Sequence, residues 1–91
     1  MNNQVFCIVD IETTGCGLLH DRIIDISAIK VKEGKIIATF QSLLNPNTYI
    51  PSSITNITGI SSDDVKYAPS FDDITLELKY FLESSIFVAH N

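Results

Sequence analysis

The most informative segment of this 91-residue chain is Val5-Phe6-Cys7-Ile8-Val9-Asp10-Ile11-Glu12-Thr13-Thr14-Gly15. Residues 5–9 are apolar on both alternation phases, a pattern that is typical of a central strand covered on both faces. Asp10 and Glu12 follow at the end of this strand. Because side chains two apart on a strand share a face, both carboxylates are expected to project together from its carboxyl end.

Two further strands are predicted immediately after this segment. Residues 23–31 alternate like a mostly buried strand, and residues 36–44 resemble a strand that returns antiparallel to it. Glu33-Gly34-Lys35 lies between them and is a hairpin signal. The domain is therefore expected to open with a three-stranded antiparallel meander.

Helices and a fourth strand are predicted in the second half. Pro51 and Gly59 bracket a short helix, and Ser61 begins a second helical turn. Ser70 stands three residues before Asp73 as a capping box, and apolar residues recur at helical spacing from there through residue 83. Residues 85–89 form a fourth strand, which can join the sheet parallel to the first because a helix separates it from the meander.

Composition limits the class of protein. With 45% hydrophobic residues the chain can build one small domain, and it contains no apolar run near the roughly 20 residues of a membrane span and no basic, then apolar, signal sequence. We therefore expect a cytoplasmic protein without a membrane partner. Eleven acids against six bases give a net charge of −5, which argues against binding nucleic acid through a basic face but not against nucleic acid as a substrate.

The paired acids Asp10 and Glu12 are the candidate chemistry. Two carboxylates on one face repel each other unless a cation lies between them, and Mg²⁺ or Mn²⁺ suits carboxylate and water ligands. The alternative is a solvated strand end, in which an acid accepts hydrogen bonds from the turn amides of Thr13 and Thr14. The spacing of two acids does not by itself decide between these interpretations.

Residues 9–15, Val-Asp-Ile-Glu-Thr-Thr-Gly, resemble the first motif of the DEDD 3′–5′ exonucleases, specifically the proofreading branch that accompanies bacterial DNA polymerase III as an epsilon subunit or within a PolC-type alpha chain. The similarity continues in order through the whole chain, at residues 22–26, 34–37, 45–46, 50–51, 57–60, 68–71 and 87–91. The resemblance implies an α/β, ribonuclease H-like mixed sheet of three antiparallel strands, a helix and a parallel fourth strand.

The resemblance also implies the chemistry, which is hydrolysis of a phosphodiester at the 3′ end of single-stranded DNA by two divalent metal ions, Mg²⁺ or Mn²⁺. Asp10 would bridge both ions, and Glu12 would bind the ion nearer the nucleophile. Thr13 and Thr14 correspond to a turn that contacts the terminal nucleotide in the family. A helical-turn or amide-capping role is the alternative for both threonines.

Three more residues match substrate-contacting positions of the family. Ser53 and Thr58 stand where some relatives have Glu and His, so helix-capping roles for both are the alternative. His90-Asn91 opens the family's second motif, in which Asn91 is the expected substrate contact and His90 is distinct from the catalytic histidine of the third motif. Thr13-Thr14-Gly15 is closer to the DNA proofreaders than to the ribonuclease branches, and the choice between DNA and RNA stays open.

The chain has no counterpart of the Asp that follows His-Asn in the second motif, nor of the His and Asp of the third. We therefore expect residues 1–91 to be the N-terminal portion of a single exonuclease domain, weakly active or inactive alone, with its C-terminal part missing. An unpaired edge strand and a sheet face without its covering helices predict self-association or partial disorder, or pairing with the remainder of a longer chain or a polymerase III alpha subunit. The alternative function is a non-catalytic truncated module used in protein interaction or assembly.

Overall fold

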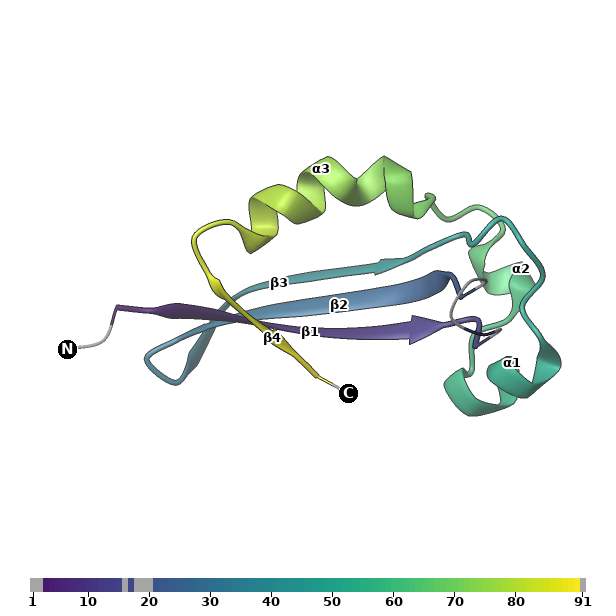
Figure 1. Ribbon diagram of the computed structural model, residues 1–91, viewed down its shortest axis with the longest axis horizontal. Coiled ribbons are helices and arrows are strands. Elements are labelled where there is room, and N and C mark those ends of the chain that lie inside the picture. The colour runs from purple at the N-terminus through teal and green to yellow at the C-terminus, as the bar shows by residue number, and fades with distance from the viewer. Residues whose placement is uncertain (1–2, 16, 18–20, 91) are drawn as a thin grey trace.

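The computed structural model describes residues 3–15, 17 and 21–90. Its elements run in the order β1 (Val5–Thr13), β2 (Ile23–Lys32), β3 (Lys35–Leu43), α1 (Ser52–Thr58), α2 (Ser62–Val65), α3 (Phe71–Leu82) and β4 (Ile86–Ala89). The four strands form one sheet in the order β3-β2-β1-β4, in which β4 is parallel to β1 and the other pairs are antiparallel (Figure 1). The α/β mixed sheet predicted from the sequence is therefore confirmed.

The hairpin between β2 and β3 forms where the sequence placed it. Glu33 and Gly34 both have positive φ, 52° and 75°, as a two-residue type I′ turn requires. Its twist matches that of the flanking strands, so β2 and β3 pair along almost their full length, from Lys32 opposite Lys35 to Asp25 opposite Leu43. In the sheet, β2 therefore has β3 on one side and β1 on the other.

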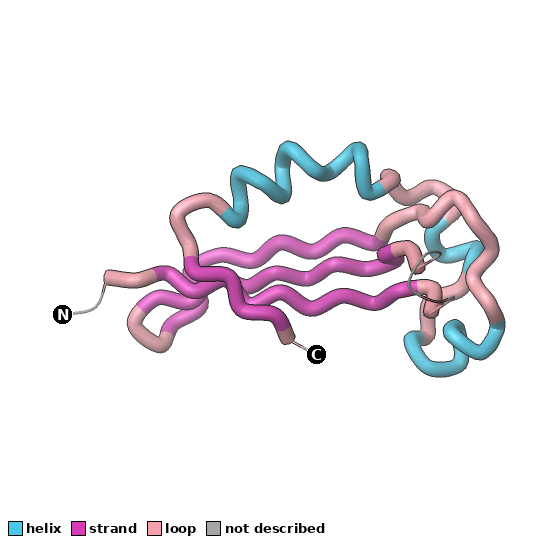
Figure 2. The backbone as a smooth tube through the Cα atoms, viewed as in Figure 1, coloured by secondary structure: helices cyan, strands magenta, loops and turns pink. Residues whose placement is uncertain are grey.

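The main core lies between the sheet and α3, which runs along one face of it (Figure 2). Ser70 and Asp73 form the expected capping box at the start of α3. Ile74 and Leu78, one turn apart on the helix, pack on the sheet. Their partners are the buried side chains Cys7, Val9, Ile26, Ala28 and Leu44. None of the described helices is long and apolar enough to cross a membrane.

The opposite face of the sheet is open within the described chain, as expected for the N-terminal part of this fold. The pattern of residues 5–9 predicted a strand covered on both faces, but Phe6 and Ile8 are each 36% exposed, and Ile86 and Val88 beside them on β4 are 42% and 39% exposed. Apolar residues on both alternation phases indicate that a strand can be buried on both faces. They do not indicate that the described chain contains the segments that pack on both faces. β4 is also an edge strand in this sheet.

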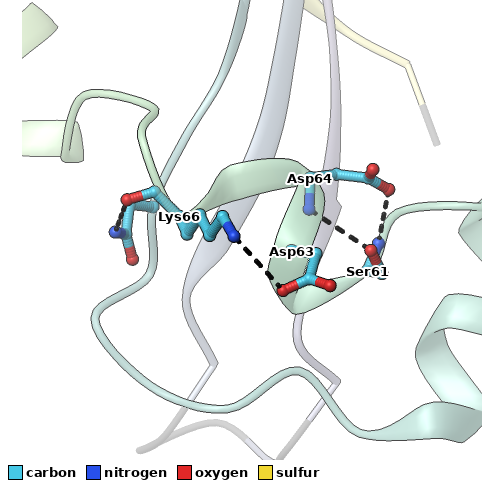
Figure 3. Close-up of polar contacts among 5 residues, drawn as sticks. Ser61, Asp63, Asp64 and Lys66 are labelled. Carbon is cyan, nitrogen blue, oxygen red and sulfur yellow. Dashed lines mark hydrogen bonds and ion pairs between the residues drawn. The ribbon is translucent and has the colours of Figure 1, made fainter.

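A second, smaller core fixes α1 and α2 at the end of the sheet where β1 ends. Ile24 on β2 packs with Ile50 and with Val65 of α2. Ser61 accepts a hydrogen bond from the Asp64 amide while the Asp64 carboxylate accepts one from the Ser61 amide, so a capping box holds this short helix (Figure 3). An ion pair of 3.9 Å joins Lys66 and Asp63 in the same view.

Candidate active site

Asp10 and Glu12 lie on the open face of the sheet, near the carboxyl end of β1. The strand is longer than expected and includes both acids, since it continues through Thr13. Val9 points to the α3 side and is buried, so Asp10 and Glu12, on the other alternation phase, point away from that core and are exposed. The local sequence thus places two carboxylates on one accessible face.

A third acid lies beside them. Asp25 on β2 is the direct partner of Glu12, and Ser27 is the partner of Asp10. Like charges directly opposite each other destabilise an antiparallel pair. Asp25 is half-buried and its Oδ1 accepts a hydrogen bond of 2.8 Å from the Gln41 amide on β3, so this carboxylate is held toward β3.

A β-bulge occurs at this position of the β1–β2 pair. Glu12 pairs with Asp25 but Thr13 pairs with Ile23, so Ile24 is the extra residue of β2. Ile24 is completely buried in the second core. Packing of Ile24 with Val65 of α2 therefore accompanies the register shift between β1 and β2, directly next to Glu12.

The fourth strand brings His90 next to Asp10. The His90 amide donates a hydrogen bond of 2.8 Å to the Val9 carbonyl, which extends the parallel pairing by one residue beyond Ala89. The Nδ1 atom of His90 lies 3.7 Å from Oδ1 of Asp10, and both side chains are more than half exposed. The sequence indicates His90 only as part of a motif, because the register of a parallel strand 80 residues away is not readable from sequence.

The two threonines after Glu12 have different environments. Thr13 is half-buried and its hydroxyl accepts a hydrogen bond of 3.3 Å from the Gly15 amide. Thr14 is fully buried, its amide donates to the Arg22 carbonyl at 2.9 Å, and its hydroxyl accepts from the Arg22 amide at 3.1 Å. Thr14 therefore ties the end of β1 to the start of β2.

The predicted substrate-contacting residues of α1 are also separated by environment. Ser53 is exposed in the first turn of the helix. The Thr58 hydroxyl donates to the Ile54 carbonyl at 2.9 Å and accepts from the Ile60 amide at 3.1 Å, which makes it part of the helix end. A β-carbon added at Gly15 would lie 2.7 Å from the side chain of Ile54, so α1 packs closely against the turn that follows β1. Asn91 lies outside the described residues.

The chemistry of the donors fits a divalent cation in part. Asp10 and Glu12 offer hard carboxylate oxygens on one face, and no hydrogen bond or ion pair to the Glu12 carboxylate occurs within the described part of the chain. Oxygen ligands of this kind suit Mg²⁺ and Mn²⁺. Residues 3–15, 17 and 21–90 bring together no group of three or more His, Cys, Asp or Glu side chains that could hold a metal ion. The described chain therefore supplies one part of a ligand set.

Comparisons with known proteins agree with this geometry. Residues 7–91 match the RNase_T family model, described as Exonuclease. A PolC-type DNA polymerase III from Caldanaerobacter subterraneus is 42% identical over 86 residues, 94% of this chain, and the chain spans only 6% of that relative's length.

Solved structures share the fold. Exonuclease X in complex with 5′ overhanging duplex DNA has a TM-score of 0.77 and 29% identity, over 94% of this chain and 48% of that one. Exonuclease I in complex with an inhibitor has a TM-score of 0.83 at 16% identity, over 100% of this chain and 22% of that one.

Proposed function

The chain belongs to the exonuclease family whose model matches residues 7–91, and from this membership we propose that it forms part of a metal-dependent 3′–5′ exonuclease domain that removes nucleotides from DNA 3′ ends. The resemblance to the DEDD exonucleases, seen first in residues 9–15, is confirmed at the level of the family. The observation that carries the proposal is the pair Asp10 and Glu12, exposed together on one face at the end of β1. Proofreading, in the cytoplasm where bacterial polymerases act, is the role that the PolC-type relatives favour.

Asp10 and Glu12 would hold two Mg²⁺ or Mn²⁺ ions. When bound, such ions lower the pKa of the attacking water and stabilise the leaving 3′ oxygen. The two carboxylates would hold the ions, and the register shift of β1 and β2 at the Ile24 bulge sets the position of Glu12.

Thr13 and Ser53 are the side chains that we propose to contact the terminal nucleotide. Thr13 is half-buried at the end of β1 and Ser53 is exposed on α1, and the close packing of Gly15 on Ile54 keeps the turn after β1 and α1 together. Asn91 is proposed as a third contact from its motif. Thr14 and Thr58, whose hydroxyls are engaged inside the protein, would act by shaping this surface.

We further propose that residues 1–91 are the N-terminal portion of a single exonuclease domain. The chain spans 48% of exonuclease X, and the open face exposes the apolar residues Phe6, Ile8, Ile86 and Val88. Such a surface is typical of a face that another segment covers. The remaining metal ligands and the general base would come with that segment, so the 91 residues alone would be weakly active or inactive.

Release of 3′-terminal nucleotides tests the exonuclease proposal. Labelled single-stranded DNA and a matched RNA would be incubated with Mn²⁺ or with chelator. The proteins would be the 91-residue chain and a chimaera that continues into the rest of the Caldanaerobacter PolC-type relative. Asp10→Asn in the chimaera should remove nearly all turnover, whereas Glu77→Gln, which neutralises an exposed acid on α3, should leave it unchanged. Near-normal turnover by the Asp10→Asn chimaera would refute the proposal, and faster release from RNA would correct the substrate class.

A non-catalytic assembly module is the second candidate, favoured by the same exposed apolar face and by the β4 edge. In that case the chain would self-associate through this face without any need for Asp10 and Glu12. Self-association of the 91-residue chain in analytical ultracentrifugation, together with an inactive chimaera, would support this interpretation. A monomeric chain with an active chimaera would remove it.

A further inference from the structure

The side chain of Asp10 has a neighbour that the proposed function does not use. Asp10 lies between Ser27 on β2 and His90 at the end of β4, with Glu12 two residues farther along β1 on the same face. Among these neighbours only His90 carries a nitrogen donor, and its Nδ1 lies 3.7 Å from Oδ1 of Asp10.

The position of His90 is fixed by backbone pairing and does not depend on its side-chain rotamer. Val9 pairs with Ala89 in the parallel β1–β4 ladder, and the His90 amide donates to the Val9 carbonyl at 2.8 Å. The next pair along is therefore Asp10 with His90, both on the face opposite the α3 core. The imidazole can change its rotamer, but its Cα cannot leave the level of Asp10 without breaking that hydrogen bond.

The distance defines the kind of contact. At 3.7 Å the two atoms are beyond the 2.7–3.2 Å range of a hydrogen bond, and a small rotation of either half-exposed side chain would bring them within it. Carboxylates that bind metal ions are commonly held by hydrogen bonds from neighbouring residues, which orient them and leave their other lone pairs for the ion. Within residues 3–15, 17 and 21–90, His90 is the group that is placed to do so for Asp10.

We propose that His90 is a positioning residue, whose Nδ1–H donates a hydrogen bond to Asp10 and orients that carboxylate toward the divalent ion. The inference rests on the proposed function, because it assumes that Asp10 binds metal. It uses the imidazole as an N–H donor and not through its charge. It also separates the roles within the His90-Asn91 pair, in which Asn91 is the proposed substrate contact.

Binding of Mn²⁺ to the 91-residue chain, measured at a fixed pH of 8 by paramagnetic broadening of the Asp10 and Glu12 amide resonances, tests the inference without any turnover. His90→Ala should weaken Mn²⁺ binding by about tenfold, the low end of the range for residues that support a metal ligand, because the pair is exposed. His90→Asn places an amide nitrogen where Nδ1 stood and should restore binding. His90→Gln places one where Nε2 stood and should behave like His90→Ala.

The outcomes separate the inference from its premise. If Asp10→Asn leaves Mn²⁺ broadening unchanged, or neither the wild-type chain nor the chimaera shows any, the metal site itself is wrong and the inference falls with it. If Asp10→Asn abolishes broadening while His90→Ala does not weaken binding, only the positioning role is overturned. Tighter binding by His90→Ala would mean that His90 competes with the ion, and restoration by His90→Gln but not His90→Asn would mean direct ligation through Nε2. Thermal melting serves as the control, since His90 is 66% exposed at its side chain and its variants should fold normally.

Discussion

Replacing Thr14 with valine tests how the end of β1 is held beside Glu12. Thr14 is completely buried, and its hydroxyl accepts a hydrogen bond of 3.1 Å from the Arg22 amide. Valine has nearly the same shape, so Thr14→Val creates no cavity and keeps the bond from residue 14 to the Arg22 carbonyl. Among the contacts between described residues, it removes the acceptor of the Arg22 amide.

The expected cost follows from that loss. Leaving a buried donor without a partner costs about 1–3 kcal/mol, and because the Arg22 amide is only partly buried the lower part of that range, about 1–2 kcal/mol, applies. For a domain of this size each kcal/mol lowers Tm by about 4–8 °C, so Thr14→Val should melt about 4–16 °C below the wild type. Circular dichroism melting measures this shift.

Hydrogen exchange identifies the cause of the shift. The Arg22 amide should be protected in the wild type and should exchange faster in Thr14→Val. Thr14→Ser is the matched control, because it keeps the acceptor and loses only a methyl group at a cost of about 0.5–1.5 kcal/mol. Serine should therefore lower Tm but preserve the protection of Arg22. Equal protection of the Arg22 amide in Thr14→Val and wild type would refute the argument.

Two further predictions concern the turn after β1 and the core. Gly15 has φ +66°, and its added β-carbon would lie 2.7 Å from Ile54, whereas Gly34 has φ +75° in open space. Backbone strain alone should cost Gly34→Ala about 1–2 kcal/mol, and Gly15→Ala should destabilise the chain by more than this. Equal urea midpoints for the two variants would contradict the close packing of α1. Burial raises the pKa of the Cys7 thiol, against opposing influences of Lys30 and of a hydrogen bond with Ser85. Because the raised pKa favours the protonated folded state, this contribution to stability is complete below the thiol's unfolded pKa of about 8.5 and is lost as the pH rises above it. The free energy of unfolding in urea should therefore fall less between pH 7.5 and pH 9.5 for Cys7→Ala than for the wild type.

The local elements could be predicted because their signals lie within a few residues of one another. Glu33 and Gly34 specify a two-residue turn, Ser70 and Asp73 specify a helix start, and Gly59 ends α1 with φ +79°. These signals act through backbone sterics and short-range hydrogen bonds, which do not depend on the rest of the fold. The pairing of Asp10 and Glu12 on one face follows in the same way from strand alternation.

The contacts that build the candidate site could not be predicted, because they depend on register and packing between distant segments. The position of His90 opposite Asp10 is set by a parallel ladder between residues that are 80 apart in the sequence. The bulge at Ile24 accompanies the packing of this residue with α2. The apolar run of β1 indicated two covered faces, whereas the sheet has one covered by α3 and one open. By itself the sequence determined the strands, turns, caps and the pair of carboxylates, since those arise from the geometry of neighbouring residues. Only the tertiary structure decided that Thr14 is buried with its hydroxyl bonded to the Arg22 amide and that His90 lies beside Asp10, since those contacts exist only once separate strands have paired.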